Sequence, residues 1–197
     1  MELDLGQKKR IFIIGNANDK ANIEPMINQD DFIIRFNRPN PSCRLKADLL
    51  FVANGAVVVA RRSVLFNNML KKNCALLWRY TLRDIISQKY ESISFSRRLR
   101  YLLFLRWFKK KNHFNHRPNF FVPEKIQDDC TELLAPGIPS SGFLAIYLFK
   151  QYFPQIPIYI HNFTFEGWHN HNWLGEKELV EEWIDSQEIN LATSLIK

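Results

Sequence analysis

The chain of 197 residues is long enough for one domain, and its hydrophobic fraction of 46% suffices for a buried core. Its formal net charge of +7 and pI of about 9.4 favour anionic partners such as nucleotides, nucleic acid or an acidic membrane surface. The polar start, MELDLGQKKR, argues against a signal peptide, and no apolar stretch of about 18 residues predicts a membrane span.

The first half of the chain predicts a parallel sheet, because short apolar runs end in turn-forming residues. We expect strands at 11–14, 32–36, 49–53 and 75–79, a turn with a short helix at 18–29, a loop at 38–41, a helix at 56–72 and a helical turn at 82–89.

Two asparagines, Asn16 and Asn37, follow the first two predicted strands. Ligands of doubly wound α/β sheets bind beyond the carboxyl ends of the strands. An asparagine amide offers both a donor and an acceptor to a base, a ribose or a phosphate. Taken alone, each asparagine is more typical of a simple turn.

The stretch from 97 to 111 interleaves leucine and aromatic residues with arginine and lysine. Three interpretations stay open: a core-packed helix with solvated ends, an interfacial helix on an anionic membrane, or a nucleic-acid-binding segment. Nucleic acid is the least favoured partner, because no known motif accompanies the charge. Residues 112–136 contain three prolines and predict an irregular, mobile loop. We therefore expect a single domain, 1–197, with a membrane-proximal helix and lid insertion at 97–135.

A hydroxyl-rich turn, Ser140-Ser141-Gly142, precedes an apolar helix expected at 143–153. Free backbone N–H groups at such a helix start, helped by the helix dipole, form an anion site. Taken alone, the turn is equally the ordinary cap of a helix. A strand at 156–160 and an amphipathic helix after Glu176 complete the predicted elements.

Three histidines, His161, His169 and His171, lie between the last strand and the last helix. A histidine near its ordinary pKa is a natural general base for a hydroxyl. Metal binding is less favoured, because the spacing is not that of a helical zinc pair and no cysteine lies nearby. Surface histidines without a role are a third interpretation.

In this order, the motifs resemble those of a minimal bacterial member of the sialyltransferase family 29 group, and more distantly those of bacterial family 42. The matching residues are Gly15-Asn16, Asp31-Phe32, Arg35-Phe36-Asn37, Pro139-Ser140-Ser141-Gly142, and His171 followed after four residues by Glu176. The resemblance covers about residues 11–56 and 136–184. Ser141 replaces the family's usual threonine, and Cys43 and Cys130 do not match the disulfide of the animal relatives.

The resemblance implies a single Rossmann-like α/β domain with a mostly parallel sheet, the sialyltransferase-type variant of the GT-A fold. It implies an inverting glycosyltransferase that uses a cytidine monophosphate (CMP) sugar and no metal or other cofactor. His171 would be the catalytic base, and His169 would help the phosphate to leave. The expected nucleotide-binding residues are Gly15, Asn16, Asn18, Arg35, Asn37, Ser140, Ser141 and Gly142.

The implied donor sugar is sialic acid or 3-deoxy-manno-octulosonic acid (Kdo), and the acceptor is a glycan or glycolipid. The expected setting is bacterial surface polysaccharide synthesis, in the cytoplasm and peripheral to the inner membrane. Three cysteines without metal-ligand spacing are typical of reduced thiols there.

Two rival functions remain. One is a nucleotide-binding hydrolase or methyltransferase, which the low count of 7 glycines and the missing GxGxxG motif disfavour. The other is a non-catalytic, membrane-peripheral protein that binds sugar or nucleotide.

Overall fold

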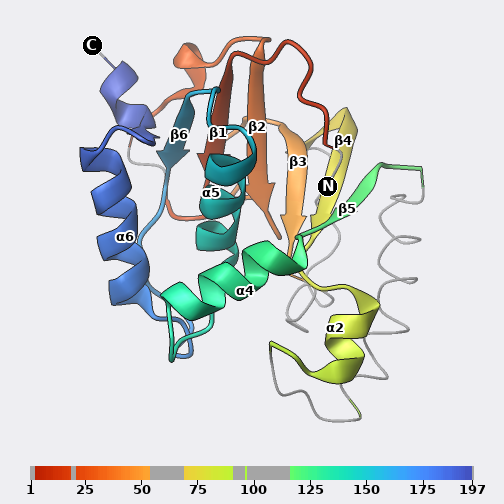
Figure 1. Cartoon of the computed structure of the whole chain (residues 1–197). Coiled ribbons are helices and arrows are strands. Elements are labelled where there is room, and N and C mark those ends of the chain that lie inside the picture. The colour runs from red at the N-terminus through yellow and green to blue at the C-terminus, as the bar shows by residue number, and fades with distance from the viewer. Residues whose placement is uncertain (1–2, 19–20, 54–68, 91–95, 97–115, 197) are drawn as a thin grey trace.

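The computed structural model describes residues 3–18, 21–53, 69–90, 96 and 116–196, which form one α/β domain around a parallel sheet (Figure 1). The strands are β1 (Arg10–Ile14), β2 (Asp31–Phe36), β3 (Ala47–Val52), β4 (Leu70–Trp78), β5 (Asn119–Phe121), β6 (Ile158–His161) and β7 (Asn190–Leu191). The helices are α2 (Leu82–Ser87), α4 (Glu124–Leu133), α5 (Ser141–Tyr152) and α6 (Trp173–Asp185), with 3-10 turns η1 (Glu24–Met26) and η3 (Ala192–Leu195).

The seven strands are all parallel and lie in the order β5-β4-β3-β2-β1-β6-β7. The chain therefore adds β2 to β5 on one side of β1, and later adds β6 and β7 on the other side. The reversal at β1 creates a topological switch point, beside which ligands of doubly wound sheets bind.

Both faces of the sheet are covered, which explains the unbroken apolar run of β1. Ile11 and Ile13 join the main core beneath α5, which crosses the face of the sheet in Figure 1. Phe12 and Ile14 point to the opposite face and pack with residues such as Ile23. A parallel strand that is buried on both faces needs apolar residues at every position rather than at alternate ones.

Most of the predicted elements are confirmed, with shifted ends. The strands expected at 11–14, 32–36, 49–53, 75–79 and 156–160 correspond to β1, β2, β3, β4 and β6, and the predicted last three helices to α2, α5 and α6. The helix expected at 56–72 is wrong at its described end, because β4 already begins at Leu70. The short helix expected within 18–29 is only the 3-10 turn η1.

The irregular structure expected at 112–136 is wrong in the described part, which contains β5 and α4, and the role of this segment as a lid stays a prediction. Two of the three prolines that suggested a loop stand at element ends, because Pro118 precedes β5 and Pro123 precedes α4, whereas Pro136 lies in the connection between α4 and α5. Proline is tolerated at these element ends because the missing N–H has no ladder or helix partner to lose.

The basic stretch at 97–111 lies outside the described residues. Among the helices that the structure describes, none combines the length and apolarity needed to cross a bilayer.

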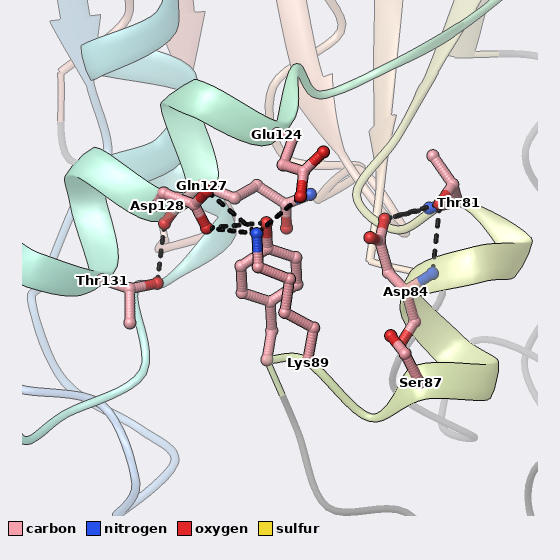
Figure 2. Close-up of polar contacts among 9 residues, drawn as sticks. Thr81, Asp84, Ser87, Lys89, Glu124, Gln127, Asp128 and Thr131 are labelled. Atoms are coloured by element: carbon pink, nitrogen blue, oxygen red, sulfur yellow. Dashed lines mark hydrogen bonds and ion pairs between the residues drawn. The ribbon is translucent and has the colours of Figure 1, made fainter.

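The segment that follows α2 is joined to α4 by a small cluster of charged and polar side chains (Figure 2). Lys89 lies 2.6 Å from a Glu124 oxygen and 2.9 Å from a carboxylate oxygen of Asp128. The Tyr90 hydroxyl donates to the same Asp128 carboxylate at 2.9 Å. These contacts join α4 to the segment that continues from β4 through Arg79, which becomes important at the site described next.

Candidate functional site

A cleft of about 760 Å³ opens at the carboxyl edge of the sheet, within the size range of small-molecule sites. Its wall combines the ends of five strands with the start of α5 and the segment that leads into α6. The residues that follow the strands are Gly15 and Asn16 after β1, Asn37 after β2, Ala53 after β3, Arg79 and Tyr80 after β4, and Asn162 after β6. The cleft therefore lies beside the switch point.

Seven of the residues expected at the site line this one cleft. They are Gly15, Asn16, Asn37, Ser140, Ser141, Gly142 and His171. Three others, Asn18, Arg35 and His169, are not among its lining residues. Segments more than 150 residues apart in the sequence are thus brought together at one edge of the sheet.

The two asparagines tie neighbouring strand ends together. Asn16 donates from Nδ2 to the carbonyl of Phe36 at 3.0 Å, and its Oδ1 accepts from the backbone N–H of Asn40 at 3.3 Å. Asn37, in the left-handed region at φ 45°, accepts at Oδ1 from the N–H of Ala53 at 2.8 Å. Each amide has two hydrogens and two acceptor sites, so these bonds leave capacity for a ligand.

Gly15 is explained by close backbone approach. A Cβ atom at this position would lie 2.2 Å from the carbonyl oxygen of Asn162, closer than any real contact. The Gly15 N–H donates to the carbonyl of His161 at 2.8 Å, which holds the end of β1 against the end of β6. The glycine therefore closes the floor of the cleft at the switch point.

The start of α5 presents backbone donors to the cleft. Ser140 caps the helix, because its Oγ accepts from the N–H of Phe143 at 3.1 Å. Ser141 and Gly142 occupy the first turn, where N–H groups have no carbonyl partner within the helix. Such a helix start, with its dipole, suits a phosphate or carboxylate.

A buried carboxylate binds this turn from α6. Glu176 is only 1% exposed, and its two oxygens accept from the N–H and the hydroxyl of Ser140, both at 2.6 Å. Burial raises the pKa of Glu176 to about 7, although the two bonds from Ser140 oppose the rise. The predicted spacing of His171 and Glu176 thus places one residue in the cleft and the other beneath it.

His171 is held in an orientation that suits a base. Its Nδ1 lies 2.5 Å from the carbonyl oxygen of Ile138. A carbonyl only accepts, so Nδ1 carries the hydrogen and Nε2 keeps its lone pair in the neutral ring. The rings of Trp168 and Trp173 flank the imidazole edge to face, with centroids 5.0 and 4.7 Å away.

The surroundings also favour the neutral form of His171. Burial is the largest cause that lowers its pKa, the bond to Ile138 opposes it, and the positive charge of Arg79 lowers it further. The imidazole is therefore deprotonated at neutral pH, as a general base must be.

Arg35, one of the expected nucleotide contacts, is not among the residues that line the cleft. Its side chain is fully buried, and its guanidinium donates to the carbonyls of Asn40, Cys43 and Leu45 at 3.0 to 3.2 Å. A side chain turned into this loop does not reach the cleft. Arg35 instead supports the loop whose Asn40 contacts Asn16.

Two other expected residues also lie outside the cleft. Asn18 lines a neighbouring cleft of about 550 Å³ and accepts from Asn40 Nδ2 at 3.4 Å. His169 is exposed, with its ring 6.1 Å from that of Trp168. His161 is buried on β6, and the described part of the chain contains no group of three side chains that could hold a metal ion.

Arg79 is the main cleft residue that was not anticipated. It is 6% exposed and directly follows β4. From sequence, Arg79 is expected only as the last residue of the strand at 75–79. Like Asn16 and Asn37, however, it is a polar residue at the carboxyl end of a strand, which is the signal by which it could be found.

Comparison with solved structures gives one informative neighbour, a crystal structure of a mammalian sialyltransferase. The two share a fold with a TM-score of 0.58 and 13% identity, over 93% of this chain and 68% of the other. No protein-family model matches the sequence, and no curated protein matches it. The chain therefore has a sialyltransferase-like, Rossmann-type fold.

Proposed function

We propose that the protein is an inverting glycosyltransferase that moves an acidic keto-sugar from its CMP donor to a glycan hydroxyl. The observation that carries the proposal is the meeting of Asn16, Asn37, Ser141 and His171 around one cleft. The sialyltransferase-like fold supports it, because the cleft occupies the edge where such sheets bind ligands.

Each group in the cleft has a role in this proposal. The amides of Asn16 and Asn37 contact the nucleotide, and the N–H groups of Ser141 and Gly142 bind the phosphate. Nε2 of His171 takes the proton of the acceptor hydroxyl as its oxygen attacks the anomeric carbon. The bond from that carbon to the phosphate oxygen breaks, and CMP leaves with the electron pair.

The leaving group suggests that no metal ion is required. CMP carries one phosphate, whose charge the helix start of α5 can stabilise. The transfer rate should therefore be unchanged by a chelator such as EDTA. A rate that falls with EDTA and returns with added Mg²⁺ would contradict this part of the proposal.

Sialic acid is the proposed donor sugar, with Kdo as the alternative, and the setting is bacterial surface polysaccharide synthesis. Both sugars are carried on CMP and both bear a carboxylate, which suits a chain of net charge +7. A peripheral contact with an anionic membrane, where a glycolipid acceptor would lie, belongs to the same proposal.

The test uses CMP-sialic acid and CMP-Kdo, each labelled in the sugar, and measures binding, hydrolysis and transfer. We expect His171→Ala to bind donor but to lose roughly 10²-fold or more in rate, the usual contribution of a general base. His116→Ala is the matched control, because His116 is exposed and outside the cleft. If neither donor binds or reacts, the proposal is wrong.

Two further outcomes are informative. Binding of a donor without turnover would make the protein a nucleotide-sugar-binding protein, in which His171→Ala leaves function intact. His169→Ala asks whether an exposed histidine beside the cleft assists the leaving phosphate. Because His169 does not line the cleft, we expect a much smaller effect than for His171.

A further inference from the structure

Arg79 is a largely buried cation, and the nearby carboxyl of Glu176, although within electrostatic reach, forms no described ion pair or hydrogen bond with it. Its side chain is on the wall of the cleft, and the residue is 6% exposed. Within the part of the chain that the structure describes, its guanidinium makes no ion pair, and its Nε is buried without a hydrogen-bond partner. Its nearest described interaction is with the ring of Tyr80, whose centroid lies 4.8 Å from Cζ.

The other buried arginine shows what a structural role looks like in this fold. Arg35 is equally enclosed, but its guanidinium donates to three backbone carbonyls. Removing a charged group from water costs several kcal/mol unless hydrogen bonds or an opposite charge compensate. Three carbonyls compensate Arg35 from within the protein. From the described residues, Arg79 receives only the ring of Tyr80 and the more distant charge of Glu176.

The cleft is the space from which an anionic ligand can reach Arg79. Arg79 also borders a cavity of only about 10 Å³, which it shares with Gln127 and Thr131. That volume admits at most about one water molecule. The cleft of about 760 Å³ is the space beside Arg79 in which a ligand fits.

We propose that Arg79 is the anion-binding residue of the cleft and pairs with an anionic oxygen group of the ligand. In the proposed function this group is the carboxylate of the sugar or the phosphate of CMP, so the identity of the ligand rests on that proposal. The planar guanidinium binds either group through two parallel N–H donors, which a lysine does not reproduce.

The position of Arg79 also links anion binding to the base. Its charge acts on both His171 and Glu176, so it lies within electrostatic reach of each. An anion that pairs with Arg79 would partly cancel this charge. Ligand binding would then make His171 a stronger base at the moment when the acceptor hydroxyl must lose its proton.

The first experiment measures thermal unfolding of Arg79→Met, Arg79→Lys and the control Arg83→Met. Arg83 is an exposed residue of α2, so its variant removes the same charge four positions away. We expect Arg79→Met to keep or raise the melting temperature, because it removes a buried charge without a partner. Millimolar sulfate should stabilise the wild type and Arg83→Met more than Arg79→Met.

The second experiment measures affinity for CMP and for the CMP-sugar in the same variants. We expect Arg79→Met to lose at least about tenfold in affinity for the CMP-sugar, as for a charge-assisted hydrogen bond, and Arg79→Lys to recover only part of it. An equal loss for CMP identifies the phosphate as the partner of Arg79. Unchanged affinity for CMP identifies the carboxylate of the sugar.

These experiments separate the two proposals. If Arg79→Met binds sulfate, CMP and CMP-sugar like the wild type, the anion subsite is wrong, whereas the transferase proposal is unaffected. A lower melting temperature with unchanged affinities would show a structural arginine and would also overturn it. If the wild type binds no CMP-sugar but its sulfate response depends on Arg79, the transferase proposal fails and the subsite stands.

Discussion

The hydrogen bond from His171 Nδ1 to the carbonyl of Ile138 decides which nitrogen of the ring is available. A base must also remain unprotonated, and the pKa of His171 is lowered, first by burial. We therefore expect the midpoint of the acid limb of kcat/KM for transfer to lie below pH 6.5, the ordinary pKa of a histidine. Initial rates on both sides of this pH measure the profile, and a midpoint above pH 6.5 would contradict the assignment.

Arg79 contributes to this profile, because its positive charge lowers the pKa of His171. We expect the acid limb of kcat/KM in Arg79→Met to move to higher pH than in the wild type, whatever the loss of absolute rate. The same initial-rate measurement tests it, with Arg83→Met as the variant whose limb stays in place. A limb that does not move would show that Arg79 and His171 act independently.

At Gly15, the addition of a single Cβ atom should change the stability of the fold. Adding a Cβ atom 2.2 Å from the Asn162 carbonyl forces β1 and β6 apart, so we expect Gly15→Ala to lower the free energy of unfolding by about 1–3 kcal/mol or more. Gly6→Ala is the control, because it has open space around it and φ +56°. Its cost is the left-handed backbone alone, about 1 kcal/mol. Urea unfolding of both variants distinguishes the cost of the steric clash at Gly15 from the cost of the left-handed backbone at Gly6.

Between elements, Glu176 connects α6 to the cap of α5. Its pKa of about 7 exceeds that of an unfolded glutamate, so the folded chain binds a proton more tightly. The stability that Glu176 contributes is thus fully present below about pH 4.5 and is lost as the pH rises through about 7. We expect the free energy of unfolding to fall less between pH 5 and 7.5 in Glu176→Gln than in the wild type.

Urea unfolding at both pH values measures this difference. Glu176→Ala, which leaves the N–H and hydroxyl of buried Ser140 without their acceptor, should be destabilised by about 1–3 kcal/mol at either pH. A Glu176→Gln variant with the pH dependence of the wild type would show that another group is responsible.

Elements were predictable from sequence where local signals agreed with the final environment. The apolar run of β1 and the apolar face of α6 both indicated their structure, because burial there follows directly from composition. The elements at 119–133 are not visible in the sequence, because Pro118 and Pro123 favour a loop locally although each stands at the start of an element. The two residues of β7 carry no periodicity at all, and only pairing with β6 defines them.

On the scale of the whole molecule, a ligand of the cleft should stabilise the fold. The cleft contacts the ends of five strands and the start of α5, so bound CMP would hold these elements together. At 100 times its Kd a ligand adds about 2.7 kcal/mol, which corresponds to roughly 5–10 °C in Tm for a chain of this size. Thermal unfolding with CMP measures it, and cytidine, which lacks the phosphate, is the control. No shift at saturating CMP would exclude this cleft as the nucleotide site.

The sequence predicts those residues of the candidate site that directly follow a strand or begin a helix. Asn16, Asn37 and Ser141 could be found because turns and caps have local signatures, and parallel strands bring their carboxyl ends to one edge. The inward direction of Arg35 could not be found, because it depends on how the loop from 40 to 45 folds back over β2. The exposure of Asn18 and His169 likewise depends on tertiary packing.

Two hydrogen-bonded contacts beside the cleft limit which segments of this fold can be exchanged with those of a homologue. The turn before α5 is bonded to the segment before α6 through Ile138 with His171, and to the first turn of α6 through Ser140 with Glu176. The conformation of each segment depends on its hydrogen bonds to the other. A chimera that imports residues 166–176 from a distant homologue without also importing 136–142 would misalign the imidazole, so the pair must be exchanged as one module.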